Sequence, residues 1–228
     1  MLRKYLALRI YPDALALVII LIALSLQNAL SGSLDVGGIV ALRARDLPSD
    51  AIVNQATGII EIVIFGAALI LWAVNHRVFL RAMLIAGNAL LTVELLASIF
   101  LLVATLNRFG SADVPWLIQD TFLILLINIL TFALWYWLID ARHHAPKPAI
   151  APPDFLFPQH ANAIKGYENW RTNFWDYLFL AAITTTSFGP AETIPLSRRA
   201  KLLVMLQVAI SLVTLSVLAA RTLSMLSD

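Results

Sequence analysis

Residues 175–190 read W-D-Y-L-F-L-A-A-I-T-T-T-S-F-G-P, and this stretch decides the architecture of the chain. Its apolar part, from Trp175 to about Thr185, measures about 16 Å as a helix, which is half the thickness of a membrane. Gly189 and Pro190 stop the helix there, and a full-length apolar run follows. This order predicts a re-entrant hairpin. Irregular backbone at membrane depth must be buried in protein or line water, so the hairpin implies a cavity or a tight helix bundle.

The composition places the whole chain in a membrane. Of its 228 residues, 60% are hydrophobic and 13% are charged, and a soluble domain could not bury that much apolar surface. We therefore predict an all-α, polytopic transmembrane protein whose main partner is the lipid bilayer. The net charge of +2 does not indicate a nucleic-acid partner. The absence of cysteine excludes disulfides, thiolate metal sites and thiol nucleophiles.

Five stretches are long and apolar enough, or nearly so, to cross a bilayer. They are Ala14–Leu30, Ala56–Val74, Val78–Leu106, Trp116–Ile139 and Leu202–Leu226. We predict five spans plus the hairpin; a hairpin that crosses fully would make a sixth span. Basic residues precede the short first stretch, so a cleaved signal peptide remains an alternative for it. The segment 142–173 is rich in proline, and we expect it to be an ordered arm that docks through Phe155, Leu156 and Phe157.

The order of elements from Trp116 to Leu226 resembles the pore module of the two-transmembrane-helix potassium channel superfamily. On that alignment Thr185–Pro190 lies where the family has T-V-G-Y-G-D. The patterns W-Y-W-L-I-D, P-D-F-L-F-P-Q and L-S-R-R-A-K-L-L are also similar to those of a group of uncharacterised bacterial polytopic membrane proteins. These resemblances imply an architecture. They divide the chain into an N-terminal three-helix region, 1–107, and a pore-module-like region, 108–228.

Within the pore-module-like region, the resemblance assigns one element to each part of the sequence. They are an outer helix at 116–139, the proline-rich loop at 142–173, a half helix at 175–185, a filter-like turn at 185–190 and an inner helix at 200–226.

The turn departs from a potassium filter, in which backbone carbonyls replace the hydration shell of the ion. Ser187 occupies the position of the first glycine, although glycine adopts the required positive φ most cheaply. Pro190 replaces the usual acid. The four consecutive hydroxyls of residues 184–187 could hold a cation in a wider, less selective site. The alternative is a capped turn whose hydroxyls bond to local backbone.

From this pattern we predict a weakly selective, cation-conducting pore with a degenerate filter. One hairpin cannot close a pore, so conduction requires a homo-oligomer, which the resemblance implies is a tetramer. The alternative is a non-conducting scaffold or regulatory subunit that binds partners through the proline-rich loop. The predicted site comprises the constriction, an acid at its mouth and a polar stripe on the last helix: Thr185, Thr186, Ser187, Phe188, Gly189, Glu192, Gln207, Ser211 and Thr214.

Other polar groups fall inside the predicted spans, namely Glu61, Asn88, Glu94, Asp120 and Asn128. A lone anion at the depth of Glu94 is costly, so these groups should face the bundle interior. They fit either an ion or proton path or simple hydrogen bonding between helices. The aromatic run Trp135–Trp137 is typical of a belt at the membrane interface.

No enzyme is predicted. Zinc-protease, phosphate-binding-loop and serine-hydrolase motifs are absent from the sequence, and His143 and His144 are adjacent, which suits a metal poorly. We therefore expect no catalytic residue, metal or cofactor. With five spans, twelve of the 16 Lys and Arg residues fall on one side. This bias predicts a bacterial inner-membrane protein with its N-terminus in the cytoplasm.

Overall fold

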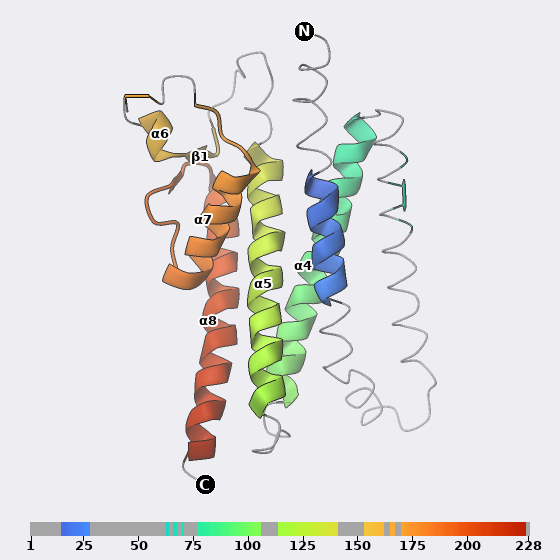
Figure 1. Ribbon diagram of the computed structural model, residues 1–228, viewed down its shortest axis with the longest axis vertical. Coiled ribbons are helices and arrows are strands. Elements are labelled where there is room, and N and C mark those ends of the chain that lie inside the picture. The colour runs from blue at the N-terminus through green and yellow to red at the C-terminus, as the bar shows by residue number, and fades with distance from the viewer. Residues whose placement is uncertain are drawn as a thin grey trace. The chain divides into compact units, whose positions relative to one another are not determined.

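The computed structural model describes residues 15–27, 63, 66–67, 70, 77–105, 114–140, 153–161, 165–166 and 170–226, and these are mostly helical (Figure 1). In chain order the elements are a helix at Leu15–Gln27, α4 at Arg77–Thr105, α5 at Val114–Asp140, β1 at Phe155–Leu156, α6 at Pro158–Ala161, α7 at Phe174–Ser187, β2 at Ile194–Pro195 and α8 at Arg198–Leu226.

Three helices are long and apolar enough to cross a membrane: Phe79–Ala104, Ile118–Asp140 and Arg198–Ala220. They confirm the expectation of a helical membrane protein. The helix Leu15–Gln27 is apolar but shorter than a span. The predicted span Ala56–Val74 lies largely outside the described residues, so the number five stays a prediction.

The chain forms two compact units. One comprises residues 1–127 and 213–228, and the other comprises residues 128–212. The expected boundary between residues 107 and 108 lies outside the described part of the chain. In the first unit, α4 buries one face, whose leucines Leu84, Leu91, Leu95 and Leu102 follow helical spacing. The amide of Gln27 donates to Ser98 Oγ at 2.8 Å and fixes the helix Leu15–Gln27 to α4.

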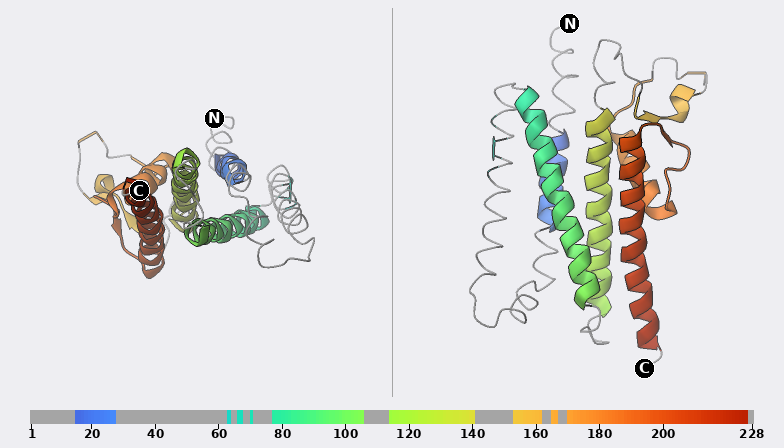
Figure 2. Two further views of the ribbon diagram at one scale, coloured as in Figure 1. Left: turned by 90° about the horizontal axis from the view of Figure 1, so that it is seen from below. Right: turned by 180° about the vertical axis from the view of Figure 1, so that it is seen from behind.

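The second unit contains the half helix that the sequence predicts. Helix α7 has 14 residues, or about 21 Å, which is too short to cross a hydrocarbon core of about 30 Å. A capping box starts it: Asn173 Oδ1 accepts from Trp175 N at 2.8 Å, and Asp176 accepts from Asn173 N. The helix begins one residue earlier and ends two residues later than expected, so residues 185–187 are helical. Figures 1 and 2 show α7 alongside the first half of α8.

The turn after α7 places two non-glycine residues in the left-handed region. Phe188 caps the helix with φ 57°, and Ala191 has φ 48°, whereas Gly189 has no positive φ. Left-handed backbone costs an L-residue about 1–2 kcal/mol, so this conformation is imposed by its surroundings. The next residues pair with the proline-rich loop as a two-stranded antiparallel sheet, with Phe155 opposite Pro195 and Leu156 opposite Ile194.

We expect Ala191→Gly to raise the unfolding free energy by about 0.5–1 kcal/mol, because glycine relieves the left-handed strain at an exposed position. The matched control is Ala182→Gly in the interior of α7, which should lower it by about 1 kcal/mol. Unfolding in detergent micelles, followed by circular dichroism, measures both. A loss of stability in Ala191→Gly would contradict the assigned backbone.

Candidate functional site

A buried polar cluster joins α7 to α5 and α8 inside the second unit. We define it as Asn128, Tyr136, Thr185, Gln207 and Ser211, all at most 2% exposed. Asn128 and Tyr136 lie about two turns apart on α5, and Gln207 and Ser211 lie one turn apart on α8, so helical periodicity turns each pair to one side. Thr185 comes from the last turn of α7. The cluster therefore brings together residues that are up to 83 positions apart in sequence.

Gln207 is the centre of the polar cluster. Its Nε2 donates to the backbone oxygen of Ala181 and to Thr185 Oγ1, both at 2.9 Å. Its Oε1 accepts from the Tyr136 hydroxyl. A buried amide without partners would cost several kcal/mol in an apolar medium. The partners of this amide lie on α7 and α5. Its hydrogen bonds are therefore all made only when the half helix is in this position.

Asn128 and Ser211 extend the polar cluster. Asn128 Nδ2 donates to Ser211 Oγ at 3.0 Å and makes a longer contact of 3.4 Å to Thr185 Oγ1. Ser211 Oγ in turn donates to the backbone oxygen of Gln207 at 3.0 Å. Thr185 thus accepts from both other helices, and its hydroxyl is the point at which α5, α7 and α8 meet.

Aromatic rings of the proline-rich loop pack against Tyr136 of the polar cluster and against Tyr177 of α7. Phe155 packs edge-on against Tyr136 at a centroid distance of 5.0 Å, and Phe157 packs edge-on against Tyr177 at 5.5 Å. Phe155 and Phe157 are buried, which confirms the expected docking for these two residues. Tyr136 and Trp137 are also buried, so they belong to the core rather than to an exposed interfacial belt.

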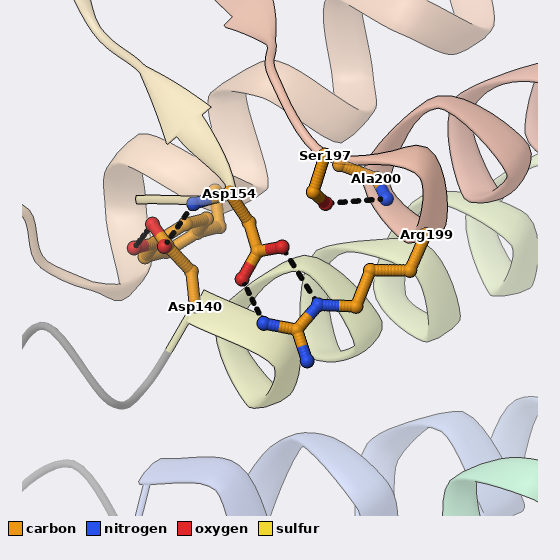
Figure 3. A network of polar contacts seen from close by, with 6 residues as sticks. Asp140, Asp154, Ser197, Arg199 and Ala200 are labelled. Carbon is orange, nitrogen blue, oxygen red and sulfur yellow. Dashed lines mark hydrogen bonds and ion pairs between the residues drawn. The ribbon is translucent and has the colours of Figure 1, made fainter. Parts of the chain in front are cut away.

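Two carboxylates and an arginine clamp the ends of the elements together (Figure 3). Asp140 Oδ2 accepts from the Tyr177 hydroxyl at 2.7 Å, and its Oδ1 accepts from the backbone N of Asp154 at 3.0 Å. Arg199 then donates to both oxygens of Asp154, with an Nε–Oδ1 distance of 2.7 Å. We call these four residues the ionic clamp. Burial and the nearby charge of Asp140 raise the pKa of Tyr177 above its usual range, so its hydroxyl remains a donor.

The predicted filter residues differ in their exposure to solvent. Thr185 is buried, whereas Thr186, Ser187 and Phe188 are exposed, Gly189 is half-buried and Glu192 is exposed. The exposed hydroxyls bond within the helix: Thr186 Oγ1 donates to Ala182 O at 3.0 Å, and Ser187 Oγ donates to Ile183 O at 2.6 Å. We call Thr186–Glu192 the polar turn.

The polar stripe of α8 lies inside the protein. Gln207, Ser211 and Thr214 are each 0% exposed, and the first two bond to α7 and α5 as described. Within one chain they therefore line no open space.

The remaining polar groups predicted in the spans lie elsewhere. Asn88 and Asp120 are buried and Glu94 is half-buried in the first unit, and Glu61 lies outside the described residues. No group of three metal-ligating side chains occurs in the part of the chain that the structure describes. His143 and His144 also lie outside it.

Sequence reasoning did not single out the ionic clamp as a site. Its one local signal was the position of Asp140 directly after an apolar span, and of Asp154 between prolines and aromatic residues. In the sequence, Arg199 is only one of several basic residues before the last apolar run. Nothing in the sequence links Asp154 to Arg199, which is 45 positions away.

Comparison with protein-family models, curated proteins and solved structures finds no match to this chain.

We expect the ionic clamp to be asymmetric. Arg199→Gln leaves the carboxylate of Asp154, which is 1% exposed, buried without its guanidinium, and should cost about 2–4 kcal/mol of unfolding free energy. Asp154→Asn leaves a guanidinium whose side chain is 51% exposed and hydrated, and should cost about 1–2 kcal/mol. Detergent-based unfolding compares the two, with the neighbouring exposed Arg198→Gln as a control that stays close to wild type. A larger loss in Asp154→Asn would refute the asymmetry.

We also expect the polar cluster to be strongly coupled. Gln207→Met keeps the volume but removes the acceptor on α8 that the Tyr136 hydroxyl uses, and should cost about 2–4 kcal/mol of unfolding free energy. Tyr136→Phe in the Gln207→Met background removes the hydroxyl that has already lost this acceptor, so the double variant should be less destabilised than the sum of the singles by about 1 kcal/mol or more. A double-mutant cycle on unfolding free energy measures this coupling, and strict additivity would contradict it.

Proposed function

We propose that this chain is a channel-like membrane protein that conducts monovalent cations with weak selectivity as a homo-oligomer. One observation carries the proposal. The half helix α7 ends in an exposed polar turn, while its opposite face is fixed to α5 and α8 by the polar cluster. The end of α7 therefore presents hydroxyl groups and a carboxylate on an exposed surface.

The chemistry of the polar turn suits a cation. The C-terminal end of a helix carries partial negative charge and carbonyls without helical partners, and half-helix ends of this kind coordinate Na⁺ in transporters. The hydroxyls of Thr186 and Ser187 donate hydrogen bonds to helix carbonyls. Their oxygens therefore retain lone pairs that can accept a hydrated cation. The exposed carboxylate of Glu192 raises the local cation concentration.

The same geometry argues for weak selectivity. A potassium filter needs extended backbone that stacks carbonyls around the ion, but here the backbone is helical through Ser187. Hydroxyls and helix-end carbonyls form a wider ring that leaves the ion partly hydrated. Several chains must contribute one turn each, and the resemblance to potassium channels makes a tetramer the proposed number.

For the orientation, we propose that the chain resides in the bacterial inner membrane with its N-terminus in the cytoplasm. The support is the bias of Lys and Arg to one side of five spans. On this count the hairpin enters from the cytoplasmic face, opposite to a potassium channel.

A non-conducting scaffold or regulatory subunit is the second candidate. The burial of Gln207, Ser211 and Thr214 favours it, because an inner helix that lines a cavity should expose its polar stripe. In this case the half helix only packs, and the proline-rich loop binds the partner.

Cation flux into proteoliposomes separates the two candidates. We expect the reconstituted chain to pass both Na⁺ and K⁺ above the level of empty liposomes. Thr186→Phe and Ser187→Phe, which narrow the polar turn, should reduce this flux at least tenfold. Glu192→Gln should reduce it severalfold at low salt, and less at high salt, where screening weakens attraction.

The matched control is Ala209→Phe, which adds the same bulk at an exposed position on α8 and should leave flux unchanged. A folded, reconstituted wild type without flux, or flux that is insensitive to bulk at the polar turn, would reject the channel and leave the scaffold.

A further inference from the structure

The exposed face of α8 changes character along its length. Arg198 and Lys201 are both exposed and lie three residues apart, so they project from the same side of the helix. Neither has an ion-pair partner among the residues that the structure describes. Their neighbour Arg199 is different, because its guanidinium is taken by Asp154. This end of the helix therefore presents two unneutralised positive charges.

An apolar ridge continues directly from these charges. Leu202 and Met205 are 66% and 67% exposed, and Leu206 and Leu212 are also exposed on the same face. From Leu202 to Leu212 the helix rises about 15 Å, which is the depth of one leaflet of the hydrocarbon core. This face of α8 thus carries positive charge at one end, followed by apolar side chains over a length equal to the depth of one leaflet.

The ionic clamp links the charged end of α8 to the end of α5 and to the start of α7. Asp140 joins the end of α5 to Tyr177 on α7 and to Asp154, which holds Arg199 (Figure 3). The starts of α7 and α8 therefore lie at one level. Trp175, one turn or less from Tyr177, is 69% exposed, and tryptophan at the ends of membrane helices marks the headgroup layer.

We propose that this face of α8 is a binding site for an anionic phospholipid. The phosphate lies against Arg198 and Lys201, and an acyl chain runs along Leu202, Met205 and Leu212. Charge complementarity selects the anionic headgroup, since a zwitterionic lipid offers no net charge to the two cations. This inference concerns the exposed face of α8 and does not rest on ion conduction.

The test is the binding of phosphatidylglycerol and phosphatidylcholine to the purified full chain in detergent, measured as retained lipid by native mass spectrometry. Wild type should bind phosphatidylglycerol in preference to phosphatidylcholine. The variant Arg198→Gln/Lys201→Gln should bind phosphatidylglycerol about tenfold more weakly, with phosphatidylcholine binding unchanged. Both positions are exposed and unpaired, so the fold should survive, which a thermal melt checks.

The matched control is Lys165→Gln/Arg171→Gln, which removes the same charge from exposed positions in the preceding loop. It should keep the preference for phosphatidylglycerol. Equal binding of the two lipids by wild type would overturn the proposal. So would an equal loss in both double variants, because that result would show that only net charge matters.

Discussion

The side-chain amide of Gln207 holds the second unit together. A half-length helix cannot rely on spanning the bilayer to define its position, and between apolar surfaces little else fixes its rotation or depth. Gln207 fixes both the rotation and the depth of α7. Its Nε2 donates to two groups on α7, and its Oε1 accepts from the Tyr136 hydroxyl on α5. In a medium without water, an amide that loses these partners finds no substitute. The helix is therefore held in one register.

The ionic clamp complements this interaction near the start of α7. Asp140 and Asp154 are buried, and each is compensated through a different element, by the Tyr177 hydroxyl and by Arg199. The polar cluster fixes α7 near its end, and the clamp fixes it near its start. These two contacts, at Tyr177 and Thr185, lie about two helical turns apart and prevent α7 from rotating about its axis. The turn that follows α7 is therefore held in its left-handed conformation.

The sequence was sufficient for features that depend on length and periodicity. The half helix follows from an apolar run that is too short to span, ended by Gly189 and Pro190. The polar stripe at Gln207 and Ser211 follows from helical spacing. The end of α7 lies two residues beyond the predicted one, because the helix continues through Thr186 and Ser187, residues of modest helix propensity whose hydroxyls donate to carbonyls four residues back. Composition also could not tell a buried Tyr136 from one in an interfacial belt. The partner of Asp154 needed three-dimensional information, since no local pattern points across 45 residues.

The bond from the Asp154 backbone N to the Asp140 carboxylate closes the 13 residues between these two aspartates into a loop whose ends are held at hydrogen-bond distance. The entropic cost of closing such a loop grows only slowly with its length. The bond therefore fixes the start of β1 against the end of α5 at a closure cost that depends only weakly on the length of chain between them.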